Sequence, residues 1–141
     1  MLKAGDKARG RAISALGLAA VALGVVGLIA ARGIDFAART GAQFGWSNGE
    51  LKVAWFNPFS ALLTIILGAV AIGGAFTGKR LLVMISAGVF ALMTLEVVLR
   101  WRNGTGSMLG GTGANIALWG LFAVGLFVCA RPGRQDVPDA A

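Results

Sequence analysis

Apolar residues dominate four long stretches of the chain, and charged residues gather at the ends of these stretches. The four apolar runs cover about residues 12–31, 58–77, 81–99 and 108–130. A helix needs about 20 residues to cross the hydrocarbon core of a bilayer, and each run is long enough or nearly so. The pattern predicts an all-α integral membrane protein, a four-transmembrane-helix bundle that forms one domain over residues 1–141.

Local signals mark where these helices begin and end. Asn57-Pro58 predicts a helix start, because asparagine is a good N-cap and proline suits the first helical position. The connection at residues 77–80 is so short that the second and third helices must form an antiparallel helical hairpin. Residues 32–57 are the only long connection, and their apolar residues predict a short interfacial helix. Residues 131–141 are polar and contain prolines, so we expect a disordered tail.

Composition supports the membrane interpretation. Of the 141 residues, 57% are hydrophobic and 13% are charged, and the mean hydropathy is +0.77. These values are too apolar for a soluble domain of this size. We therefore expect a multi-pass protein of a bacterial plasma membrane, with the lipid bilayer as its surroundings. The formal net charge of +7 would suggest nucleic acid in a soluble protein. Here the cations lie at the ends of the spans, so no nucleic acid partner is expected.

The distribution of lysine and arginine predicts the orientation in the membrane. Cytoplasmic segments of membrane proteins carry an excess of these residues. If both termini lie in the cytoplasm, the inner segments hold eight of them and the outer segments hold five. The inner set is Lys3, Lys7, Arg9, Arg11, Lys79, Arg80, Arg131 and Arg134, and the outer set is Arg32, Arg39, Lys52, Arg100 and Arg102. This bias favours a topology with both termini cytoplasmic.

Small residues recur at alternating spacings of three and four along three of the four runs. Such stripes let helix backbones approach closely, which is how helices associate in lipid. The predicted helix-packing seam consists of Gly17, Ala20, Gly24, Gly27, Gly68, Ala71, Gly113, Ala117 and Gly120. We expect these residues in the interior of the bundle. The alternative is that stripes arise by chance in a chain with 22 glycines.

Glu96 is the only carboxylate within the spans, and Arg100 follows it one helical turn later. The predicted topology gathers most polar side chains of the spans near the outer surface. This candidate outer polar cluster comprises Asn57, Ser60, Thr64, Thr94, Glu96, Arg100 and Asn115. One hypothesis is an outward-facing pocket at Glu96 and Asn115, since ionisable groups in membranes often serve function. The other is a structural i,i+4 ion pair, favoured because Glu96 lies only about 5 Å from the end of its span.

Several kinds of chemistry have no residues to support them. The sequence has no histidine, so histidine-ligated haem, histidine-based metal sites and Ser-His or Cys-His nucleophiles are excluded. The single Cys129 excludes an enzyme that works through paired cysteines. We therefore expect no catalytic residues, no metal and no cofactor, and we predict that the protein is not an enzyme.

Two segments resemble a family of four-helix membrane proteins that is common in actinobacteria and has no assigned activity. The first is residues 55–68, where Asn57-Pro58 precedes a glycine-bearing apolar helix, and the second is residues 113–121 with Asn115. The resemblance implies the same four-span plan over nearly the whole chain. Members commonly carry histidine after the Asn-Pro pair and in the fourth span, whereas this chain has Phe59 and Ser60 after the pair. No histidine-based function is therefore implied.

Three hypotheses for the function follow from the sequence. The leading one is a non-catalytic accessory or scaffolding subunit that packs against partner helices or against copies of itself. The alternative is a small oligomeric transporter or channel component that binds a solute from outside near Glu96 and Asn115. A third is a lipid-binding or envelope-biogenesis factor that uses the outer loop and its aromatic residues.

Overall fold

The computed structural model describes residues 4–36, 42–46, 51–104, 107–111 and 113–131. Within these residues the chain forms four helices and one two-stranded hairpin. All four helices are long and apolar enough to cross a membrane, so the predicted four-helix architecture is confirmed. The helices are α1 (Ala4–Ala30), α2 (Pro58–Thr77), α3 (Arg80–Arg102) and α4 (Gly113–Ala130).

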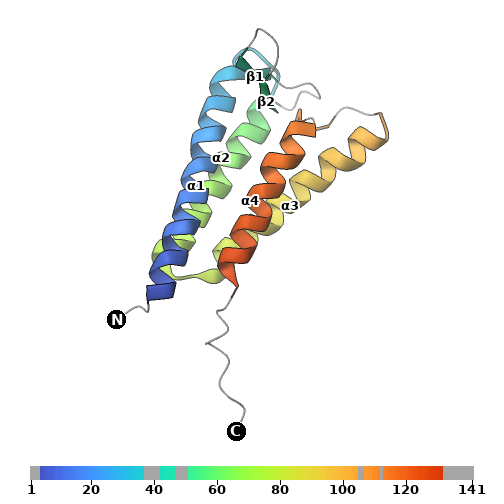
Figure 1. Ribbon diagram of the computed structural model, residues 1–141. Helices are drawn as coiled ribbons and strands as arrows, with labels where there is room; N and C mark the ends of the chain where they lie inside the picture. The colour runs from blue at the N-terminus through green and yellow to red at the C-terminus, as the bar shows by residue number, and fades with distance from the viewer. Residues whose placement is uncertain (1–3, 37–41, 47–50, 105–106, 112, 132–141) are drawn as a thin grey trace.

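The helices run alternately up and down, so that connections gather at two opposite ends of the bundle (Figure 1). The start of α1, the turn between α2 and α3 and the end of α4 lie at one end, which we call the terminal end. The hairpin and the α3–α4 connection lie at the opposite end, which we call the hairpin end. Helices α1 and α2 lie side by side along their length, while α3 leans away from the others towards the hairpin end.

Helix α2 begins and ends where the sequence predicts. The Ser60 amide donates a hydrogen bond to Asn57 Oδ1 at 2.8 Å, and the Asn57 amide donates to Ser60 Oγ at 3.2 Å. This reciprocal capping box satisfies amide groups that the first turn of a helix leaves unpaired. At the other end, Gly78 has a φ of 68°, a left-handed conformation that glycine adopts without strain. The tight turn places α3 antiparallel to α2.

The long connection contains strands where we expected a short helix. Strand β1 (Ala42–Trp46) pairs in antiparallel register with β2 (Leu51–Phe56), with a register shift between Phe44 and Gly45. The expected interfacial helix is wrong for the described part of this connection, because Ile34 and Phe36 lie outside any helix and Phe44 lies in β1. Ala37 and Ala38, which were also expected in it, lie outside the described residues. The physical reason is that valine and aromatic residues favour strands, and that Asn48-Gly49, a strong hairpin signal, stands between the two runs in the sequence.

The predicted small residues of α1 and α2 lie at a close contact between these two helices. A Cβ built on Gly17 would lie 2.8 Å from the Gly68 carbonyl oxygen, and one built on Gly68 would lie 2.6 Å from the Gly17 carbonyl oxygen. The two backbones therefore touch, with no room for a side chain between them. The members of the predicted helix-packing seam that are buried along α1 and α2 are Gly17, Ala20, Gly24, Gly27, Gly68 and Ala71.

Helix α4 departs from the prediction in two ways. It begins at Gly113, whereas the apolar run predicted a start near residue 108. Residues 107–111 instead form part of the connection, with a turn closed by the Gly110 amide bonding to the Ser107 carbonyl at 3.0 Å. Its small residues also do not form a buried stripe, because Ala117 is exposed while Gly113 and Gly120 are half-buried. The expected disordered tail lies outside the described residues, apart from Arg131.

Aromatic residues fill the centre of the bundle. Trp119 of α4 is fully buried and meets the ring of Phe56 edge-on, with ring centroids 5.9 Å apart. Phe90 of α3 packs against Phe122 of α4, with ring centroids 5.3 Å apart. These contacts join β2, α3 and α4, whereas α1 and α2 are joined mainly through small residues. The core therefore combines close backbone contact on one side with aromatic bulk on the other.

Candidate functional site

The candidate outer polar cluster lies at the hairpin end of the bundle. Its members differ in exposure. Asn57, Ser60, Thr64 and Asn115 have no exposed surface. The side chain of Glu96 is 26% exposed and that of Arg100 is 41% exposed. Because four of the seven predicted residues are completely buried, most of the cluster belongs to the interior of the protein.

Glu96 binds the connection between α3 and α4. The Ser107 hydroxyl donates a hydrogen bond to Glu96 Oε2 at 2.5 Å, and the Met108 amide donates to Glu96 Oε1 at 3.1 Å. The Leu109 amide in turn donates to Ser107 Oγ at 3.1 Å. Both oxygens of the carboxylate are thus engaged by the connection. Hydrogen bonds to charged groups are stronger than those between neutral groups, so this carboxylate is a firm attachment point.

The same connection is held from its other side by Asn57. Its side-chain amide donates a hydrogen bond to the Met108 carbonyl at 2.8 Å, while its oxygen caps α2. Met108 therefore bonds to Glu96 through its amide and to Asn57 through its carbonyl. A continuous set of hydrogen bonds links α3, the connection and the start of α2. We call Asn57, Glu96, Ser107 and Met108 the loop-fastening network.

The remaining predicted residues serve their own helices or lie at the edge of the cluster. Arg100 Nε lies 3.7 Å from Glu96 Oε1, so the predicted i,i+4 ion pair is present at the surface. Thr64 donates to the Ser60 carbonyl at 2.7 Å, and Thr94 donates to the Phe90 carbonyl at 2.9 Å. Asn115 lies buried in the first turn of α4.

Two members of the network could not be recognised as such from the sequence. Ser107 lies in a glycine-rich connection, and the apolar run places Met108 at the start of the fourth span. Met108 takes part only through its backbone amide and carbonyl. Because nearly every residue type has these groups, the sequence does not reveal this role. The available signal was the lone carboxylate, because a charged group near lipid needs partners. That signal pointed to Arg100 alone.

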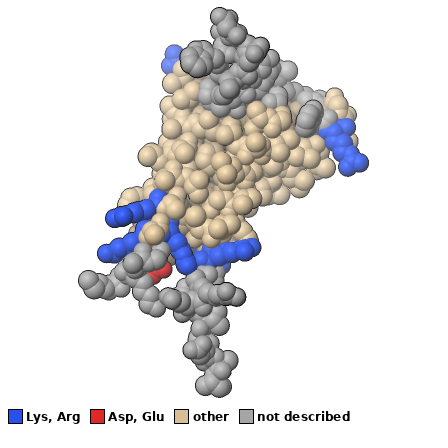
Figure 2. All heavy atoms as spheres, viewed as in Figure 1, with Lys and Arg blue, Asp and Glu red and all other residues tan. Residues whose placement is uncertain are grey.

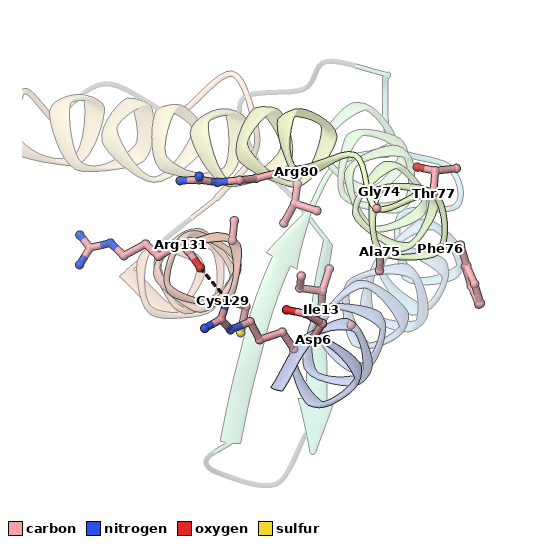
Figure 3. Close-up of a pocket in the computed structure, with 14 residues that line it drawn as sticks. Asp6, Ile13, Gly74, Ala75, Phe76, Thr77, Arg80, Cys129 and Arg131 are labelled. Carbon is pink, nitrogen blue, oxygen red and sulfur yellow. Dashed lines mark hydrogen bonds between the residues drawn. The ribbon is translucent and has the colours of Figure 1, made fainter. Parts of the chain in front are cut away.

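A cavity with a different character opens at the terminal end. It has a volume of about 530 Å³ and lies among the ends of all four helices (Figure 3). Its lining includes Asp6, Arg9, Arg80 and Arg131. Figure 2 shows that most lysine and arginine side chains on that face gather at this end of the molecule. The sequence pattern had assigned these cations to membrane orientation only.

The chain matches no family model, no curated protein and no solved structure. The resemblance to the actinobacterial four-span family therefore stays a prediction. Any functional conclusion has to rest on the geometry of the two ends of the bundle.

Proposed function

We propose that this protein is a non-catalytic accessory or scaffolding subunit of a bacterial plasma membrane, with both termini in the cytoplasm. The observation that carries this proposal is the loop-fastening network. The membrane carboxylate Glu96 directs both oxygens to Ser107 and Met108 of its own chain. A carboxylate used in this way stabilises the fold. The role of Glu96 is therefore structural.

The solute-binding alternative has less support from the same geometry. It placed a pocket at Glu96 and Asn115, but Asn115 is completely buried. Opening such a pocket would require breaking hydrogen bonds of the loop-fastening network. The proposed role is non-catalytic because the sequence has no histidine to serve as a general base.

The outward face of α4 is the surface we propose for a partner helix. Ala117 is exposed on this helix, and the neighbouring Gly113 and Gly120 are half-buried. Small residues favour close helix association in lipid. The fold uses the stripes of α1 and α2 internally, whereas the α4 stripe is left facing outwards at Ala117. A partner helix, or a second copy of the chain in a larger assembly, would approach there.

The test is purification of the tagged full chain from its native membrane in mild detergent. We expect a second polypeptide in fixed stoichiometric ratio. Ala117→Trp places bulk on the proposed contact face and should reduce the amount of partner retained by about tenfold, because a blocked packing site loses the contacts that hold the helices. The matched control is Ala91→Trp, which puts the same bulk on an exposed alanine of α3.

The control variant should retain the partner at the wild-type ratio. Recovery of a pure ring of identical chains that conducts a solute after reconstitution would contradict the accessory role and favour transport. Equal retention by both tryptophan variants would remove α4 as the contact surface.

A further inference from the structure

The cavity at the terminal end combines positive charge with an apolar floor. Arg9 comes from α1, Arg80 from α3 and Arg131 from the end of α4, and all three line the cavity. The only carboxylate among the described lining residues is Asp6. No described carboxylate lies within ion-pair distance of the three guanidinium groups. The cavity therefore carries an excess of positive charge that the described part of the chain does not neutralise.

Two of the arginines approach the C-terminal end of α4 from neighbouring helices. Arg9 Nη1 donates a hydrogen bond to the Arg131 carbonyl at 3.3 Å, which brings the α1 cation to the last residues of α4 (Figure 3). Arg80 extends from α3 towards the same helix end (Figure 3). Cations near a helix C-terminus are favourable by themselves. This hydrogen bond engages one nitrogen of Arg9, and the Arg131 guanidinium stacks on Phe127. The other nitrogens of Arg9 and the guanidinium group of Arg80 are left for an anion.

Apolar residues continue the cavity into the bundle. Ile13 and Val83 line its inner part, and both are buried. The Arg131 guanidinium carbon lies 4.7 Å from the centre of the Phe127 ring, and Phe127 is exposed on the outer face of α4. A cation stacked on an outward-facing ring stands where headgroups meet acyl chains in a bilayer. A free inorganic ion would use the charge of this cavity but not its apolar part.

We propose that this cavity binds the phosphate headgroup of an anionic phospholipid, such as phosphatidylglycerol, from the leaflet at the terminal end. Basic pockets between transmembrane helices on the cytoplasmic side recognise such headgroups through charge. Arg9 and Arg80 contact the phosphate, Arg131 adds positive charge at the rim, and Ile13 and Val83 contact the glycerol backbone and the start of an acyl chain. The inference rests on insertion of the four helices in a membrane, but it does not rest on the accessory role.

The test measures which lipids the full chain retains when it is released from nanodiscs into the gas phase for native mass spectrometry. The nanodiscs contain equal amounts of phosphatidylglycerol and phosphatidylcholine with identical acyl chains. We expect the wild-type protein to retain phosphatidylglycerol in preference. Arg9→Gln with Arg80→Gln should lower that preference by about 25-fold, since each arginine in contact with the anionic headgroup contributes about fivefold.

The matched control is Arg11→Gln with Lys79→Gln. It removes the same charge from the same end of the molecule, at exposed positions that do not line the cavity. This control should lower the preference by no more than about twofold, because screened surface charges act weakly. Arg9→Lys with Arg80→Lys keeps the charge and should keep most of the preference. Helix content measured by circular dichroism checks that every variant is folded.

Three results would overturn the proposal. The first is equal loss of preference in the two glutamine variants, which indicates diffuse attraction to a basic surface. The second is equal retention of both lipids by the wild-type protein. The third is release of phosphatidylglycerol by millimolar inorganic phosphate, which assigns the cavity to a soluble anion. Because the assay needs no partner protein, its outcome is independent of the test of the accessory role.

Discussion

Hydrogen bonding of polar atoms at single positions shows which side chains the fold depends on. Glu96 accepts two hydrogen bonds from the α3–α4 connection and lies near Arg100. Trp119 is the opposite case, because its indole Nε1 is buried without a hydrogen-bond partner among the described residues. A polar group with hydrogen-bond partners stabilises the structure, whereas a buried one without a partner costs free energy. These two residues therefore respond differently to substitution.

Removing the Glu96 carboxylate should loosen the connection. We expect Glu96→Ala to lower the free energy of unfolding by about 2 kcal/mol, because two hydrogen bonds to a charged group are lost. Equilibrium unfolding in mixed micelles measures this change. Asp35→Ala is the control, since Asp35 is an exposed carboxylate outside the helices and should change stability by less than about 0.5 kcal/mol. Unchanged stability of Glu96→Ala would contradict the structural role of the carboxylate.

Trp119 should matter through its volume and not through its polar nitrogen. Trp119→Phe keeps an aromatic ring against Phe56 and removes the unpaired N–H, so we expect a loss of less than about 1.5 kcal/mol. Trp119→Ala leaves a large cavity in the core and should cost about 3–5 kcal/mol. The same unfolding measurement compares the two variants. A loss from Trp119→Phe as large as that from Trp119→Ala would mean that the nitrogen has a partner.

At the scale of elements, close contact between α1 and α2 stabilises the bundle. A Cβ built on Gly24 would lie 2.6 Å from Ile65 Cγ1 and 2.7 Å from the Ala61 carbonyl oxygen. Real side chains do not approach backbone atoms so closely, so even alanine must push α1 away from α2. Gly73 also lies within α2, but a Cβ built there would meet no atom within 4 Å. The two glycines therefore form a matched pair.

Gly24→Ala should destabilise the bundle by about 1–3 kcal/mol, the usual cost of excess volume in a packed interface. Gly73→Ala should be neutral or stabilising by up to about 1 kcal/mol, because alanine favours helix more than glycine does. Thermal unfolding in detergent, followed by loss of helical signal, compares them. Identical melting of both variants would show that α1 and α2 do not pack through this face.

The helices differ in how well the sequence predicts their bounds and their buried faces. Helix α2 has the predicted bounds because Asn57, Pro58 and Gly78 are strong local signals. The sequence predicts an earlier start of α4 because Met108 and Leu109 are apolar, but hydrogen bonds from their amides to Glu96 and Ser107 hold them outside the helix. The exposure of Ala117 could not be predicted either. The spacing of small residues along a helix does not show whether they contact another helix of the same chain.

Over the whole molecule, the two ends of the bundle differ in what their polar groups do. At the hairpin end, the loop-fastening network uses polar side chains to hold a connection in place. At the terminal end, arginines surround a cavity without carboxylate partners among the described residues. The sequence predicted the charge asymmetry but not the cavity, because the cavity is formed by residues that are far apart along the chain. The proposed function and the lipid site both require that four helices span the membrane, and the proposed function also requires the terminal end to lie inside.

Labelling of single cysteines in intact cells tests this claim most directly. In a Cys129→Ala background, Asn103→Cys places a thiol at the hairpin end and Lys79→Cys places one at the terminal end, both at exposed positions. A maleimide that does not cross membranes should label Asn103→Cys in intact cells, and Lys79→Cys only after the membrane is permeabilised. Labelling of Lys79→Cys in intact cells, with protection of Asn103→Cys, would contradict the orientation that the proposed function requires.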